Sequence, residues 1–142
     1  TGVQVEVLAD PSLPANGPGR AENGNLHLSE FRLQIDGKPA AIGNATADFN
    51  QSGWEIGRSI DGNAESAWGI HPEEGKPHQA IFTLATPLEC SPGTAVEVTL
   101  EQLHGRGHII GRPRISISSE ENPKASAPLP TEIAELIAIP KH

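Results

Sequence analysis

Near the middle of the chain, a short run of oxygen-bearing residues could form a tight loop around a cation. Asp61 offers a carboxylate, Gly62 permits backbone conformations closed to other residues, and Asn63 favours a turn. Ser66 adds a hydroxyl, and the large aromatic residue Trp68 ends the run. Such a set of oxygens suits calcium, which takes roughly six to eight oxygen ligands. The alternative is an Asx-type turn between two strands, with Trp68 filling the core.

A second set of reactive side chains lies in the sequence HGRGH, which begins at His104 and ends at His108. The two histidines have the His-x-x-x-His spacing of a helical zinc pair. Gly105 and Gly107 disfavour a helix, and an extended chain would carry the two rings apart. The sequence therefore does not favour zinc here.

The same segment is basic in an otherwise acidic protein. His104, Arg106 and His108 are the predicted ligand-binding residues, because they can donate hydrogen bonds to sugar hydroxyls or acidic sugar groups. Trp54 is a secondary candidate, either as an aromatic platform for a sugar ring or as an anchor of its loop. In the alternative interpretation, these cations and Arg112 pair with local acids and close one end of the fold.

Composition predicts the architecture that must position these residues. The 142 residues suffice for one domain with a real core, and 15 glycines and 13 prolines indicate many turns. Together they predict an all-β sandwich or barrel. The net charge of −8 argues against nucleic acid or an anionic membrane as the main partner.

Cysteine content and hydropathy add further limits. Cys90 is the only cysteine, so an internal disulfide is excluded. No apolar run approaches the roughly 20 residues of a membrane span. The chain opens without a signal peptide, so we expect an excised module of a larger protein.

Alternating apolar residues predict the strands. Val3, Val5 and Val7 mark the first, and a long polar loop follows over residues 10–25. The pattern resumes over residues 26–35 with a phase change near Ser29 and Glu30, which suggests a bulge or bend. Asp36–Gly37 is a hairpin signal leading to a strand over residues 40–49.

Three further strands are predicted in the second half. Residues 80–85 are apolar on both faces, which is typical of a central strand. Residues 96–101 alternate, and so does 109–118, with Ile115 and Ile117 facing inward. The predicted domain covers residues 1–119, and residues 120–142 form a linker and a short helix over 131–139.

The run Ile60-Asp61-Gly62-Asn63, followed by Ser66 and Trp68, resembles the IDG…(S/T)xW signature of discoidin, or coagulation factor type C, domains. These domains belong to the galactose-binding-like superfamily. The resemblance implies an antiparallel β-sandwich of jelly-roll type with a structural calcium in this loop.

The resemblance also implies a set of calcium ligands. In the family, a glutamate at the start of the last strand closes the site. The matching sequence here, Leu28-Ser29-Glu30-Phe31, precedes the loop, so the order of the chain resembles a circular permutation. The implied ligands are side-chain or main-chain oxygens of Ser29, Glu30, Arg58, Asp61, Asn63 and Ser66.

An ion pair is the alternative to calcium. Arg58, Arg112 or Arg114 could pair with Asp61 and remove the need for a cation. The position of Glu30 distinguishes the two interpretations, because calcium requires this residue beside the loop.

Several other segments widen the resemblance, among them residues 12–31, 75–78 and 105–118. Together they resemble a discoidin-like module of large planctomycete surface proteins that carry cytochrome-c-like haem domains. In those proteins the module is regarded as a carbohydrate binder. No haem attachment motif occurs in this chain, so haem chemistry is not implied.

The sequence leads to one main functional hypothesis. No Ser-His-Asp, nucleotide-binding or clear paired-carboxylate pattern stands out, so we expect no enzymatic activity. We expect a carbohydrate-binding module that targets a larger, extracytoplasmic multidomain protein to polysaccharide. The competing hypothesis is a structural or protein-docking β-sandwich that contacts neighbouring domains of the same parent chain.

Overall fold

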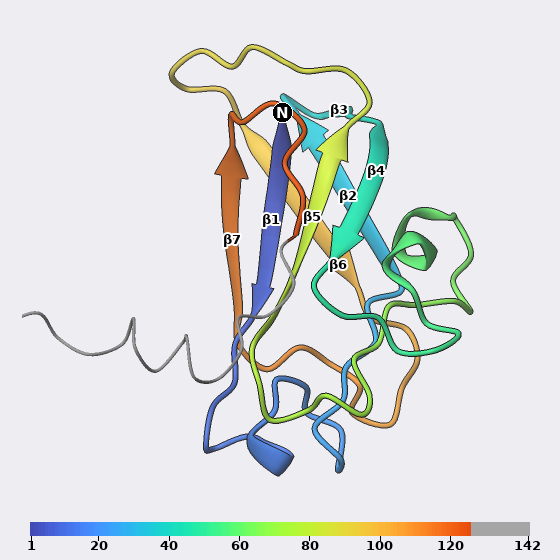
Figure 1. Ribbon diagram of the computed structural model, residues 1–142. Coiled ribbons are helices and arrows are strands. Elements are labelled where there is room, and N and C mark those ends of the chain that lie inside the picture. Colours follow the sequence, from blue (N-terminus) through green and yellow to red (C-terminus); the bar gives the residue numbers. More distant parts are fainter. Residues whose placement is uncertain (126–142) are drawn as a thin grey trace, which may run out of the picture.

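Strand β1 (Gly2–Val7) lies inside the larger of two sheets, and the rest of the fold is built around it (Figure 1). The computed structural model describes residues 1–125. Val3, Val5 and Val7 are buried, whereas Gln4 and Glu6 are half-buried. The predicted alternation therefore holds along this strand.

Two antiparallel sheets make up the fold. The larger has the order β4-β5-β1-β7, with β4 at Ile42–Ala47, β5 at His78–Leu84 and β7 at Pro113–Ser118. The smaller has the order β3-β2-β6, with β3 at Lys38–Pro39, β2 at Glu30–Ile35 and β6 at Val96–Glu101. It lies behind the larger sheet in Figure 1. This arrangement confirms the predicted all-β, sandwich-like architecture, and β5 is central as predicted.

The core fills the space between the sheets. Phe31 of β2 stacks on Phe82 of β5, with ring centroids 3.8 Å apart and planes inclined by 4°. Trp68 is fully buried, and its indole N–H donates to the carbonyl of Phe49 at 2.9 Å. The hydrogen bond satisfies the one polar atom of this large side chain, so Trp68 serves the core as expected.

The predicted hairpin at Asp36–Gly37 joins β2 to β3, and both residues have positive φ, at 48° and 76°. Such angles match a type I′ turn. A strand does lie within the predicted range 40–49, but it covers only Ile42–Ala47 and belongs to the other sheet. Residues 38–39 pair with β2, whereas Ile42–Ala47 pairs with β5.

Strand β7 also differs from its prediction. It begins at Pro113 rather than near Ile109, and Ile115 and Ile117 are 44% and 70% exposed. Both lie opposite buried valines of β1, so they are on the core side of the sheet. They stay exposed because β7 is an edge strand and the smaller sheet has only three strands.

Residues 120–125, part of the predicted linker, lie against the larger sheet. Pro123 is buried and its carbonyl accepts a hydrogen bond from Thr83, and the backbone N–H of Ala125 donates to Thr46. The predicted helix over 131–139 lies outside the described residues. Two short 3-10 segments, η1 (Pro14–Asn16) and η2 (Ile56–Ile60), are the helical elements of the described part. No helix within residues 1–125 is long and apolar enough to cross a membrane.

Candidate functional site

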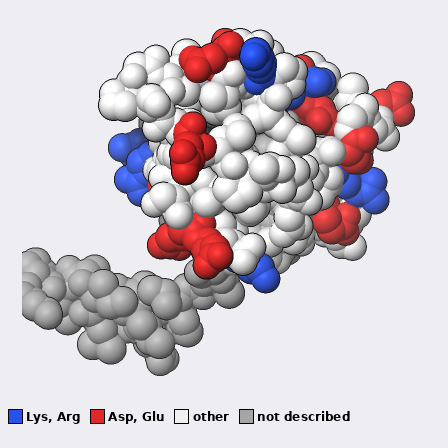
Figure 2. Space-filling model, turned by 90° about the horizontal axis from the view of Figure 1, so that it is seen from above, with Lys and Arg blue, Asp and Glu red and all other residues white. Residues whose placement is uncertain are grey.

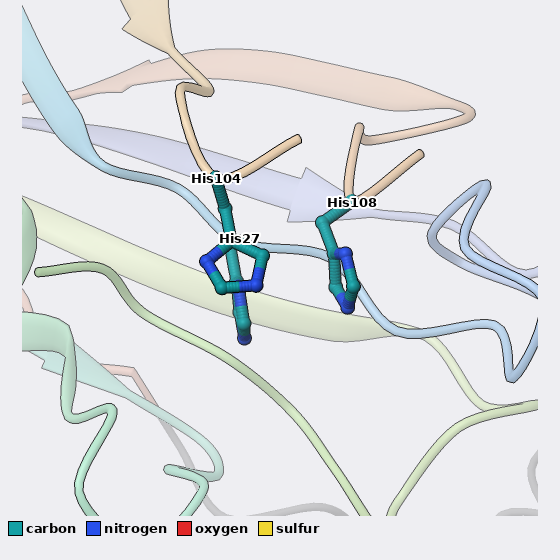
Figure 3. Close-up of side chains that lie close together, drawn as sticks. All are labelled: His27, His104 and His108. Atoms are coloured by element: carbon teal, nitrogen blue, oxygen red, sulfur yellow. The ribbon is translucent and has the colours of Figure 1, made fainter. Parts of the chain in front are cut away.

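The loops at one end of the sandwich bring three histidines together (Figures 1 and 3). His27 precedes β2, whereas His104 and His108 belong to the loop between β6 and β7. Their nearest ligand nitrogens all lie within 4.8 Å of one another. We call His27, His104 and His108 the histidine cluster.

Backbone conformation explains why the two loop histidines meet. Gly105, Arg106 and Gly107 all have positive φ, at 81°, 52° and 74°. This left-handed run curls the chain back, so that the rings of His104 and His108 lie 4.6 Å apart. The expectation that the rings would be carried apart is wrong, because the segment forms a tight turn rather than an extended strand.

His27 lies at the centre of an aromatic stack. Its ring lies between Trp54, at 4.3 Å and 10°, and His108, at 4.5 Å and 16°. His104 meets it edge-on at 4.2 Å. A backbone hydrogen bond from His27 to the carbonyl of His108 holds the two segments together.

His27 is 3% exposed, and neither of its ring nitrogens has a hydrogen-bond partner of good geometry among residues 1–125. The amide oxygen of Gln51, which raises the pKa of His27 somewhat, already accepts from Asn25 and His71. Burial, followed by the charges of His104 and His108, lowers the pKa of His27 to about 4. His27 is therefore neutral at pH 7.

The rings of His104 and His108 differ in exposure and in hydrogen bonding. His104 is exposed, and partial burial, His108 and Arg106 lower its pKa. His108 is half-buried, and its Nδ1 lies 3.0 Å from the carbonyl oxygen of Gly105. Since a carbonyl only accepts, Nδ1 carries a hydrogen, and in the neutral form of the ring the lone pair of His108 is on Nε2.

A shallow hollow adjoins the histidine cluster. It is lined by Ala21, Glu22, Asn23, Arg106 and His108. Arg106 is exposed and forms no ion pair within the described part of the chain. Arg112, by contrast, pairs with Asp10 at 3.3 Å. The interpretation that local acids neutralise these cations thus holds for Arg112 and not for Arg106.

The second candidate site lies in the loop after η2. The hydroxyl oxygen of Ser66 is 2.9 and 2.7 Å from the two carboxylate oxygens of Asp61. It is also 3.2 Å from the carbonyl of Arg58 and 3.0 Å from that of Asn63. A hydroxyl has one hydrogen, so Ser66 can donate to only one of these four oxygens. The other three oxygens lie close together and receive no hydrogen bond from Ser66.

Glu30 lies beside this loop. It is 5% exposed, and its Oε1 has no hydrogen-bond partner among the described residues. Burial raises the pKa of Glu30 and so does the charge of Asp61, while a hydrogen bond from the backbone N–H of Gly62 opposes the shift. The carboxyl groups of Glu30 and Asp61 therefore lie close together, and a cation beside them would stabilise their charged forms.

The arginines that could replace a cation have other partners. Arg58 pairs with Glu55 at 3.0 Å, Arg114 with Glu6 at 2.6 Å, and Arg112 with Asp10. Partial burial raises the pKa of Asp61, but hydrogen bonds from Ser66 and Asn63, the charge of Arg58 and a hydrogen bond with Glu30 together lower it. No ion pair to Asp61 occurs within residues 1–125. Ser29 is buried next to Glu30, and its hydroxyl accepts from the backbone of Leu103.

Of the predicted ligand-binding residues, Trp54 and His104 meet at the histidine cluster, and Arg106 and His108 line the adjoining hollow. His27, which completes the cluster, was not among the predicted residues. His27 lies between Leu26 and Leu28 in an apolar run, and no spacing relates it to the later histidines.

Comparison of the chain with protein-family models, with curated proteins and with solved structures finds no match.

Proposed function

We propose that the protein is a non-catalytic carbohydrate-binding module. The observation that carries this proposal is the hollow lined by Arg106 and His108 together with Ala21, Glu22 and Asn23. Residues distant in the sequence meet there to offer hydrogen-bond donors, acceptors and the aromatic ring of His108, whereas Trp54 lies on the far side of His27. Sugar binding uses these three kinds of contact.

The charge of the hollow favours a particular class of glycan. Arg106 has no acidic partner in the described residues, and a guanidinium can hold a carboxylate or sulfate with two parallel hydrogen bonds. Asn23 and Glu22 add groups that can bond sugar hydroxyls. Glycans with uronic acid or sulfate groups are thus the preferred candidates, ahead of neutral ones.

Binding to an array of neutral, uronic and sulfated glycans, followed by affinity electrophoresis in polysaccharide gels, tests the proposal. Retention by at least one acidic polysaccharide is the expected result. Absence of binding across all three classes would reject carbohydrate binding and favour the alternative below.

A docking domain is the second candidate, and the edge strand β7 favours it. Ile115 and Ile117 leave apolar surface uncovered beside a groove lined by Leu33, Leu84, Leu88, Val96 and Ile117. A neighbouring domain of the same parent chain would bury this surface. Figure 2 looks onto this end of the sandwich, where acidic and basic side chains are spread around the periphery.

We infer a galactose-binding-like jelly roll, circularly permuted relative to discoidin domains, in an extracytoplasmic multidomain protein. Glu30 lies beside the loop although it precedes Asp61 in the chain. The corresponding glutamate of discoidin domains follows the loop, so this position supports the permuted relationship.

We further infer that calcium is a structural ion in the loop. The carboxylates of Asp61 and Glu30, the hydroxyl of Ser66 and the carbonyls of Ser29, Arg58 and Asn63 would hold it. The unpartnered buried oxygen of Glu30 and the four oxygens around Ser66 support this assignment. When bound, calcium would neutralise the two acids and tie the loop to β2.

A further inference from the structure

We propose that His27, His104 and His108 form a binding site for a divalent transition-metal ion, with Zn²⁺ as the preferred occupant. This site is separate from the oxygen-rich loop around Asp61. It does not depend on glycan binding, because the ligands are three side chains of the free protein.

The ligand set determines the class of metal. The cluster of possible ligands within residues 1–125 consists of three imidazoles, without a carboxylate or a thiolate. Imidazole nitrogen suits zinc, copper and nickel, whereas calcium and magnesium take oxygen. Three protein ligands on zinc also leave a fourth position for water or another donor.

The distances are close to those that a metal requires. At Zn–N distances of about 2.0–2.1 Å, two nitrogens of a tetrahedral site are about 3.4 Å apart. The nitrogens of the cluster lie within 4.8 Å of one another, and binding one ion requires His108 to turn out of its stacked position on His27 and His104 to turn toward the same point. His104 has the room to rotate because it is exposed.

His108 is already prepared for coordination. Its Nδ1–H donates to the carbonyl of Gly105, which leaves the lone pair of Nε2 free. Metal-bound histidines usually donate their second nitrogen to a carbonyl or carboxylate in this way, because the bond fixes the tautomer and orients the ring.

His27 supplies the strongest structural reason. A buried polar side chain normally has a hydrogen-bond partner, yet both nitrogens of His27 lack one in the described structure. Trp54 and His108 cover the two faces of its ring, so the ring is held in place while its nitrogens are left unsatisfied. A metal ion bound through one of these nitrogens would give that nitrogen a partner, and Gln51 lies near enough to the ring to raise the pKa of His27.

Calorimetric titration with ZnCl₂ tests the proposal on chelator-treated protein without a polyhistidine tag and without glycan. One Zn²⁺ should bind per chain. His104→Ala and His108→Ala should each weaken binding by at least about tenfold. Neither of these two side chains is fully buried, so both variants should fold.

Two controls define specificity. His71→Ala removes an exposed histidine outside the cluster and should leave Zn²⁺ affinity unchanged, as should Asp61→Asn in the oxygen-rich loop. Titration with Co²⁺ should give the visible absorption bands of a four-coordinate ion, and the bands should be lost in His104→Ala.

Absence of stoichiometric Zn²⁺ binding would overturn the proposal, and so would binding that survives the double substitution H104A/H108A. Either result would mean that the histidine cluster only packs beneath the loops and binds no metal. Because no sugar is present, these outcomes are distinct from a failure of glycan binding.

Discussion

His78 and Asp48 form a buried pair that joins β5 to the end of β4. Nδ1 of His78 lies 3.1 Å from Oδ2 of Asp48, and the two side chains are only 1% and 4% exposed. Nε2 of His78 lies 2.7 Å from the carbonyl oxygen of Glu73. Both partners are acceptors, so both ring nitrogens must carry hydrogen and His78 is an imidazolium.

The stability that this pair contributes should fall as pH rises. Burial lowers the pKa of His78, but the hydrogen bonds to Asp48 and Glu73 outweigh it and raise the pKa above the ordinary value of 6.5. The folded state therefore binds more protons than the unfolded state between the two pKa values. The stabilisation is complete below the unfolded pKa and is lost as pH rises through the folded pKa. His27 and His104, whose pKa values are lowered, act in the opposite direction below about pH 7. The decline due to His78 should therefore be measured as the difference in denaturant midpoint between the wild type and His78→Gln from pH 5.5 to 9.

His78→Gln serves to assign the effect. Removing one partner of a buried charged pair costs on the order of 3 kcal/mol, so the variant should be less stable at pH 6 and its decline with pH should be shallower. His71→Gln, at an exposed position, should retain the wild-type slope. A stability difference between the wild type and His78→Gln that does not shrink as pH rises contradicts the assignment.

Calcium should stabilise the protein through the loop around Asp61. A ligand at 100 times its dissociation constant adds about 2.7 kcal/mol to the free energy of unfolding. A chelator should accordingly lower the melting temperature of the wild type, and calcium should restore it. Asp61→Asn should abolish the difference, because it removes one of the two acids.

Asp10→Asn provides the matched control, since Asp10 is a loop acid bonded to Ser12 and Arg112 and lies outside the proposed site. Its response to chelator should equal that of the wild type. If the melting temperature of the wild type ignores both chelator and calcium, the loop is an ordinary turn.

The stack of Phe31 on Phe82 predicts a large loss of stability on truncation. Phe82 is fully buried between the sheets, and Phe→Ala at such a site costs about 3–5 kcal/mol. Ile117→Ala, on the uncovered side of β7, should change stability by less than about 0.5 kcal/mol. Urea denaturation measures both. If Ile117→Ala lowers the free energy of unfolding as much as Phe82→Ala does, the side chain of Ile117 is covered in solution.

Local patterns explain which parts of the fold the sequence could predict. The valines of β1 and the Asp36–Gly37 turn depend on side-chain alternation and backbone freedom, which neighbouring residues determine. The change of sheet after Pro39 and the exposure of Ile117 depend on how many strands the opposite sheet has. That number is a property of the whole topology, so alternation alone could not reveal it.

The candidate sites show the same limit. Asp61, Asn63 and Ser66 are close in sequence, and their hydrogen bonds follow from local turn geometry. Only the resemblance to discoidin domains predicted that Glu30 lies beside this loop. His27 could not be found at all, because its meeting with His104 depends on the left-handed run at residues 105–107 and on a backbone bond between distant loops.

Arg106, which lines the hollow, and Arg112, which does not, provide the sharpest test of glycan recognition. Arg106→Ala should weaken binding to an acidic polysaccharide by about tenfold or more, since a hydrogen bond to a charged group contributes about 1.5–3 kcal/mol. The melting temperature should be nearly unchanged, because Arg106 is exposed and has no ion pair in the described residues.

Arg112→Ala is the matched control. Its guanidinium is already paired with Asp10, so its loss should leave affinity within about twofold of the wild type. Affinity gels run at several salt concentrations measure both variants. If Arg106→Ala binds as tightly as the wild type, the glycan contacts lie elsewhere on the surface.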